Sequence, residues 1–95
     1  FIAITGHDTS VTDPGVEGIL FIRGQEVSGA LDGKYVHSNS FNLKNTIPAG
    51  TEISEALKLD SVLVQINHPN RDHILLQDID NLEGLFAIEV ANYYN

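Results

Sequence analysis

Four residues of types that bind metal ions stand at intervals along the chain: His7, Glu26, His37 and His68. Three imidazoles and one carboxylate form a ligand set that suits Zn, Mn or Fe better than Ca or Mg. The chain has no Cys, so no thiolate is present to impose a softer metal. Such a set acidifies bound water and polarises a phosphoryl oxygen, and two ions about 3.5–4 Å apart clamp both the attacking and the leaving oxygen. These residues therefore predict metal-dependent hydrolysis.

The positions of two histidines favour the metal interpretation. His7 and His68 each follow a short apolar run that is typical of a buried strand. In proteins built from parallel strands, the carboxyl ends of the strands gather at one edge, where sites are built. Taken singly, each histidine is more often a hydrogen-bonded structural or surface residue than a ligand. His73 has no such position, and we expect it on the surface.

Residues 26–43 predict a β-hairpin whose two-residue loop is Asp32-Gly33. In the register set by that loop, Glu26 and His37 become diagonal neighbours on one face of the hairpin, with Cβ atoms about 7 Å apart. The two side chains would then be within reach of one ion. A slip of one residue would send one of them to the other face.

Three further residues are candidate catalytic or binding groups: Asp8, Arg71 and Glu89. Glu89 is expected on a strand among small neighbours, where it would orient an imidazole or, equally, bind backbone or water. Arg71 follows His68 closely and matches phosphate geometry, and its alternative is a solvated surface residue. Asp8 would serve as a ligand, as a base or only as a loop residue that bonds local backbone.

The composition narrows the classes of partner. The chain has 42% hydrophobic residues, as expected of a folded protein, and a formal net charge of −8 with only five Lys plus Arg. Binding to nucleic acid or to an anionic membrane needs clustered positive charge, so neither is expected. Every apolar run is shorter than the roughly 20 residues of a membrane span. We expect a soluble protein, with the cytoplasm slightly favoured, although the absence of Cys leaves the redox compartment open.

The apolar runs predict an α/β protein with mainly parallel strands and few or short helices. In addition to the strand that precedes His7, strands are expected at 19–28, 61–66 and 85–92. Short helices are expected at 55–59 and 73–82. The turn-rich segment 8–18 reads as a loop, too short for the helix that usually joins parallel strands. Because an apolar strand is expected at each end, we also expect the 95 residues to be part of a larger protein.

The chain resembles the PHP (polymerase and histidinol phosphatase) family of metal-dependent phosphoesterases. Five segments carry the resemblance, in the family's order: Ile4-Thr5-Gly6-His7-Asp8-Thr9, Gly24-Gln25-Glu26-Val27-Ser28, Lys34-Tyr35-Val36-His37, Ile66-Asn67-His68-Pro69 and Ala87-Ile88-Glu89-Val90-Ala91-Asn92. The resemblance implies that His7, Glu26, His37 and His68 are metal ligands, and that Glu89 and Asn92 form a strand-end motif near the site. It implies a distorted (β/α)7 TIM-like barrel that holds two or three divalent ions, Zn, Mn or Fe, and a small phosphorylated substrate.

The chain also departs from the family pattern. Gly6 stands where the family usually has Asp, and the family's His-x-His pair before this segment and Asp-x-His pair after it are missing. We therefore expect residues 1–95 to form a partial PHP-like hydrolase domain, a portion of the barrel. On that expectation the parent protein hydrolyses phosphate esters, and the isolated chain is weakly active or inactive.

Two alternatives to a phosphoesterase stay open. The first is a non-catalytic metal-binding or interaction module, in which exposed strand edges are covered by an oligomer or a partner chain. The second is an amidohydrolase-like metallohydrolase, because a similar rim of histidines and carboxylates supports amide hydrolysis. The loops that set substrate specificity are short here, so the residues name no particular substrate.

Overall fold

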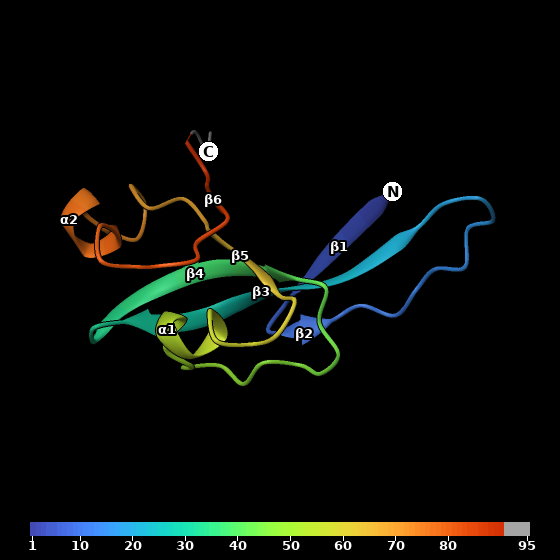
Figure 1. Cartoon of the computed structure of the whole chain (residues 1–95), viewed down its shortest axis with the longest axis horizontal. Coiled ribbons are helices and arrows are strands. Elements are labelled where there is room, and N and C mark those ends of the chain that lie inside the picture. Colours follow the sequence, from blue (N-terminus) through green and yellow to red (C-terminus); the bar gives the residue numbers. More distant parts are fainter. Residues whose placement is uncertain (91–95) are drawn as a thin grey trace.

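Residues 1–90, which a computed structural model of the chain describes, form one mixed sheet of six strands with two short helices (Figure 1). The elements in chain order are β1 (Ile2–His7), β2 (Thr9–Ser10), β3 (Phe21–Leu31), β4 (Lys34–Phe41), α1 (Ile53–Ala56), β5 (Leu63–Ile66), α2 (Leu76–Ile79) and β6 (Ala87–Ile88). The strand order is β2-β1-β3-β4-β5-β6. The β1/β3 and β5/β6 pairs are parallel, and the other pairs are antiparallel.

The long β3–β4 hairpin is the middle of the sheet (Figure 1). Its loop residues both have positive φ, 48° at Asp32 and 81° at Gly33. This backbone is that of a type I′ turn, which Asp-Gly sequences favour because its twist matches that of the strands. Ser28 lies opposite His37. The predicted hairpin register is therefore confirmed.

The predicted portion of a parallel (β/α)7 barrel is wrong. The sheet is mixed and open in the part of the chain that is described, with β2 and β6 at its edges. A two-residue turn can only reverse the chain, so it places β4 antiparallel between two strands of the opposite direction. Each helix has only four residues, which is too short to cover a sheet in the manner of a barrel helix. β1 and β3 are joined by a connection that contains β2 but no helix.

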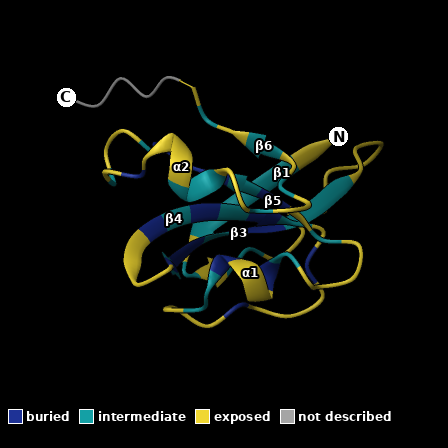
Figure 2. Cartoon of the chain, turned by 60° about the vertical axis from the view of Figure 1, so that its left-hand side comes forward, coloured by how far each residue is buried: buried dark blue, intermediate teal, exposed yellow. Residues whose placement is uncertain are grey.

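One face of the sheet packs against the core. Val27 and Val64 of the sheet contact the buried side chains of Leu43, Ile47 and Ala56, which come from α1 and the segment before it. A second cluster closes the turn end of the hairpin; its buried members are Leu31, Val36, Ile53, Ile66 and Ile74. Figure 2 shows the buried residues concentrated along β3 and β4.

A buried amide fixes the segment before α1 to the sheet. The Gln25 side chain is fully buried; its Nε2 donates to the carbonyl of Ile47 (2.7 Å) and its Oε1 accepts from the backbone N–H of Ile47 (2.8 Å). Both polar ends of the amide are satisfied, so its burial costs little. The core face is therefore closed by a specific contact as well as by apolar packing.

The opposite face of the sheet is polar near the ends of β1 and β5. Side chains alternate between the two faces along a strand, and the residues that share this face include Thr5, Glu26, His37, Asn39 and Gln65. This face carries the side chains with which metal or substrate chemistry is possible.

The last predicted strand differs most from the sequence expectation. In place of a buried strand over 85–92, β6 has two residues, and the side chains of Phe86 and Val90 are 60% and 95% exposed. Asn92 lies outside the described residues. Within residues 1–90, neither helix has the length and apolar character needed to cross a bilayer.

Candidate metal centre

The topology brings the ends of three parallel strands together. His7 is the last residue of β1, His68 lies just beyond β5, and Glu89 follows β6. Because β4 runs in the opposite direction, His37 near its start reaches the same end of the sheet. The β1/β3 register pairs His7 with Glu26. The four predicted metal ligands therefore lie in one region of the polar face.

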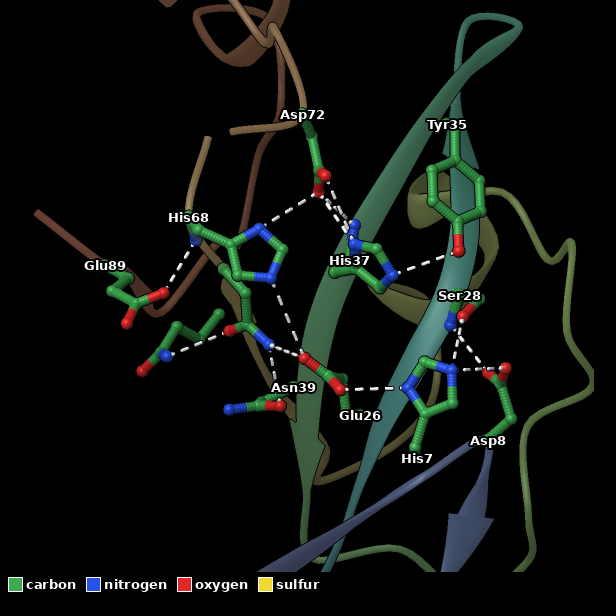
Figure 3. Close-up of polar contacts among 12 residues, drawn as sticks. His7, Asp8, Glu26, Ser28, Tyr35, His37, Asn39, His68, Asp72 and Glu89 are labelled. Atoms are coloured by element: carbon green, nitrogen blue, oxygen red, sulfur yellow. Dashed lines mark hydrogen bonds and ion pairs between the residues drawn. The ribbon is translucent and has the colours of Figure 1, made fainter. Parts of the chain in front are cut away.

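The closest group of potential ligands consists of His37, His68 and Asp72. One ligand atom from each lies within 4.8 Å of the others, a geometry found once among the described residues. The Oδ2 atom of Asp72 is 3.0 Å from Nδ1 of His37 and 3.3 Å from Nδ1 of His68. Figure 3 shows both rings on the side of the Asp72 carboxylate, and their centroids are 4.9 Å apart. The arrangement is two imidazoles and one carboxylate that converge.

The Nδ1 atom of His68 has an unsatisfied hydrogen-bonding capacity. It is buried and makes no hydrogen bond with any described residue, and the side chain is only 9% exposed. Asp72 is close enough, but the two atoms lack hydrogen-bonding geometry. A buried nitrogen without a partner costs roughly 1–3 kcal/mol. The backbone of His68 also has a positive φ of 22°, and such conformations are concentrated at functional sites.

Asp72 is a site residue that the sequence interpretation missed. It lies four residues after His68, and the turn between them is closed by N–H groups of Arg71 and Asp72 that donate to the His68 carbonyl (2.9 and 3.2 Å). The carboxylate also accepts the backbone N–H of His37 at 2.9 Å. The His-x-x-x-Asp spacing was the only available signal, and it becomes informative only once this stretch is known to form a turn.

The second ring nitrogen of each imidazole faces another polar group. Nε2 of His37 is 3.0 Å from the Tyr35 hydroxyl, and the two rings meet edge to face. Nε2 of His68 is 3.9 Å from Oε2 of Glu26. Metal-binding histidines commonly use one nitrogen for the ion and give the other N–H to an acceptor. The orientation of both rings, with Nδ1 toward Asp72, fits that pattern.

His7 and Glu26 form a pair beside this cluster. Nδ1 of His7 is 3.0 Å from Oε1 of Glu26, and the imidazole is 63% exposed. The hydrogen bond to Glu26 raises the pKa of His7 above its ordinary value. Partial burial opposes ionisation of Glu26, but the hydrogen bonds from His7 and Asn67 outweigh it and lower the pKa of Glu26. Two of the predicted ligands, His37 and His68, thus belong to the cluster, and the other two lie next to it.

The candidate catalytic residues occupy different positions. Asp8 (φ 52°) accepts the backbone N–H of Ser28 at 2.6 Å; burial opposes its ionisation, but the Ser28 hydrogen bonds prevail and lower its pKa. Glu89 accepts the backbone N–H of His68 at 2.7 Å, so it binds backbone rather than an imidazole in this contact. Arg71 is exposed on the turn, and His73 is exposed as predicted.

The donor set suits a borderline divalent ion such as Zn or Mn, because it combines imidazole nitrogens with a carboxylate and includes a buried ring nitrogen without a hydrogen-bond partner. Comparisons of the chain with protein-family models, with curated proteins and with solved structures gave no match.

Proposed function

We propose that the chain binds a divalent transition-metal ion through His37, His68 and Asp72, and that this centre serves the hydrolysis of a small phosphate ester. The observation that supports metal binding is the buried Nδ1 of His68, which has no hydrogen-bond partner in residues 1–90 and lies 3.3 Å from a carboxylate oxygen. An ion at this point accepts the lone pair and balances the negative charge of Asp72. A single bound ion would therefore satisfy the His68 nitrogen and neutralise the Asp72 carboxylate.

The choice among metals follows from the ligand atoms. Two imidazoles and a carboxylate are the ligand types of zinc and of non-haem iron or manganese sites, and they leave coordination positions open. Ca and Mg prefer oxygen ligands throughout. The centre is therefore expected to take Zn, Mn or Fe, one ion at the three residues of the cluster.

Phosphate ester hydrolysis is supported by the residues around the cluster and by the resemblance to the PHP family. The chemistry that a divalent ion supplies, when bound, is polarisation of a phosphoryl oxygen and a lowered pKa of water. His7 is exposed, and its pKa is raised by Glu26, so it retains a proton at higher pH and is placed to donate it to a leaving oxygen. The Tyr35 hydroxyl holds the His37 imidazole in orientation, and Glu26 lies 3.9 Å from the second nitrogen of the His68 ring.

The metal site is tested by a matched pair of substitutions. Zn²⁺ is titrated calorimetrically into the chelator-treated protein, into Asp72→Asn and into Asp60→Asn, in which the carboxylate removed is exposed and outside the cluster. Loss of a group that only supports a ligand costs about 10–100-fold in affinity, so loss of Asp72 is expected to cost at least that much. Asp60→Asn should bind as the unaltered protein does. Equal affinity in all three proteins would overturn the assignment.

The hydrolytic activity is tested separately. With Zn²⁺ or Mn²⁺ bound, the chain is assayed on aryl phosphates and on aryl amides of the same leaving group. Slow turnover of the phosphates alone, lost in Asp72→Asn, is expected, because the chain is expected to be a partial hydrolase domain. Turnover of the amides would favour an amidohydrolase-like enzyme, and tight metal binding without any turnover would favour a non-catalytic metal-binding module.

A further inference from the structure

A polar cleft of about 210 Å³ adjoins the candidate metal centre. It extends across the polar face, from Thr5 of β1 to Glu89 after β6, and Glu26 and His68 lie on its wall. Its volume is below the range of about 300–1,000 Å³ that is usual for drug-sized ligands. The cleft therefore has room for one small ring or chain next to the metal ligands.

Three amide side chains of the cleft form a hydrogen-bonded row. Nε2 of Gln65 donates to Oδ1 of Asn67 (3.1 Å), and Nδ2 of Asn67 donates to Oδ1 of Asn39 (2.9 Å) and to Oε2 of Glu26 (3.2 Å). Asn67 is buried, and both of its amide N–H groups are used. The row is held in a fixed orientation, as a preformed binding surface requires.

The row leaves hydrogen-bonding groups at both ends. The NH₂ group of Asn39 and the carbonyl oxygen of Gln65 make no hydrogen bond within residues 1–90, and neither is among the fully buried atoms without a partner. One end therefore offers donors to solvent and the other an acceptor. A ligand that satisfies both must itself both donate and accept hydrogen bonds.

The charges of the lining exclude an anionic group from this cleft. No Lys or Arg lines it, whereas Glu26 and Glu89 do. Both oxygens of Glu26 are already engaged, by His7 and by Asn67. A cation offers no acceptor to the Asn39 donors, whereas a hydroxyl group, which both donates and accepts, matches the Asn39 donors and the Gln65 acceptor.

We propose that this cleft binds the neutral, hydroxyl-bearing part of the substrate, such as the ring of a sugar or cyclitol, while the phosphate lies at the metal centre. This assignment of substrate class rests on the proposed function. On this proposal Asn39 and Gln65 bind the ring, and the metal centre binds the charged phosphate.

The experiment uses three rings of similar size without phosphate and without metal: myo-inositol, cyclohexanol and cyclohexylammonium. The side-chain amide signals of Asn39 and Gln65 are followed by ¹⁵N NMR on the whole chain. Myo-inositol is expected to shift both signals with saturation, and the other two rings are not. Preference for cyclohexylammonium would overturn the neutral class, and an equal response to cyclohexanol would overturn recognition of several hydroxyls.

Variants and a metal-loaded comparison sharpen the test. Gln65→Leu should abolish the response to myo-inositol, and Gln77→Leu, at an exposed position on α2, should not. Asn39→Asp keeps the oxygen that Asn67 needs but loses the donors, so it should weaken myo-inositol binding even if Gln65→Leu does not fold. In the Zn²⁺-loaded protein, myo-inositol 1-phosphate should bind about tenfold more tightly than inorganic phosphate, as two added hydrogen bonds predict.

The outcomes separate the two proposals. If Zn²⁺ does not bind, the proposed metal centre is wrong, and the NMR titration with myo-inositol alone decides whether the cleft binds a hydroxyl-bearing ring. Zn²⁺ and inorganic phosphate binding with no gain from the ring, and no shift at Asn39 or Gln65, overturns the assignment of the cleft alone.

Discussion

The imidazole of His7 and the carboxylate of Glu26 lie 3.0 Å apart at the end of β1, and each favours the charged form of the other. The hydrogen bond to Glu26 raises the pKa of His7 above 6.5. Burial acts against the charge on Glu26, but hydrogen bonds from His7 and Asn67 together lower its pKa below 4.5. Both groups are therefore charged at pH values between the lowered pKa of Glu26 and the raised pKa of His7.

This coupling predicts a pH-dependent contribution to stability. A raised histidine pKa stabilises the fold below pH 6.5 and the effect is lost as the pH rises through the folded-state pKa of His7. A lowered glutamate pKa stabilises above pH 4.5 and the effect is lost as the pH falls through the folded-state pKa of Glu26. His7→Gln is thus expected to destabilise the protein most between pH 4.5 and 6.5, and least above pH 8.

Denaturant unfolding of both proteins across this pH range measures the effect. NMR titration of the His7 ring gives its pKa directly, and in Glu26→Gln that pKa should fall back toward 6.5. A His7 pKa that is the same with and without Glu26 would show that the pair does not interact in solution.

Asp72 shows what residue types alone do not reveal. The four predicted ligands could be selected because they stand at strand ends or in a hairpin with a calculable register. Asp72 is one of 13 acidic residues and stands between the loop after His68 and the short helix predicted at 73–82. Its position beside His37 depends on the turn after His68 and on a hydrogen bond to the β4 backbone. The His-x-x-x-Asp spacing alone does not reveal either contact, because it is informative only once the turn is known.

Among the elements, the β3–β4 hairpin depends most on its own local sequence. Asp32 and Gly33 determine the turn, and the turn determines which residues of β3 and β4 face each other. The pairing of Ser28 with His37 could therefore be derived without knowledge of the rest of the fold. The same turn places His37 near Glu26, so the site depends on it.

Gly33→Ala tests this dependence. Gly33 has φ of 81°, and an added Cβ would meet no atom within 4 Å, so the cost comes from the backbone conformation alone. A left-handed conformation costs a residue other than glycine about 1–2 kcal/mol, and the free energy of unfolding in urea should fall by that amount. Asp32→Asn is the control, because Asn accepts positive φ as readily as Asp and should leave stability nearly unchanged. An unaffected Gly33→Ala variant would contradict the type I′ turn.

The strand predicted at 85–92 and the first two residues of the strand predicted at 19–28 show where element prediction fails, although the rest of the latter is confirmed by β3. An apolar run indicates that a strand is favoured, but it does not say whether both faces will be covered. In the structure, Leu20 and Phe86 are 70% and 60% exposed, because no long helix from residues 1–90 packs over that part of the sheet. The expected parallel barrel required such helices, and the short helical stretches between the strands supply only one turn each.

On the scale of the whole molecule, the candidate metal centre adds to the contacts between the β3–β4 hairpin and the segment after β5, which also share a core cluster and several hydrogen bonds. His37 belongs to the hairpin, and His68 and Asp72 belong to the segment after β5. The two parts are also linked by the Asn67 N–H to the His37 carbonyl (2.9 Å) and by the Lys34–Asp78 ion pair (2.8 Å). An ion bound to all three ligands would therefore act as a cross-link of the fold.

Metal binding is accordingly expected to raise the thermal stability of the entire sheet. At a free Zn²⁺ concentration of 100 times Kd, a ligand that binds only the folded state adds about 2.7 kcal/mol. For a domain of this size, about 1 kcal/mol moves Tm by roughly 4–8 °C, so the expected rise is about 10–20 °C. Thermal unfolding followed by circular dichroism, with Zn²⁺ and with excess chelator, measures it. Asp60→Asn should show the full rise and Asp72→Asn little of it. An equal Tm with Zn²⁺ and with chelator would return His37 and His68 to a purely structural role, because a bound ion cannot leave the stability of the folded state unchanged.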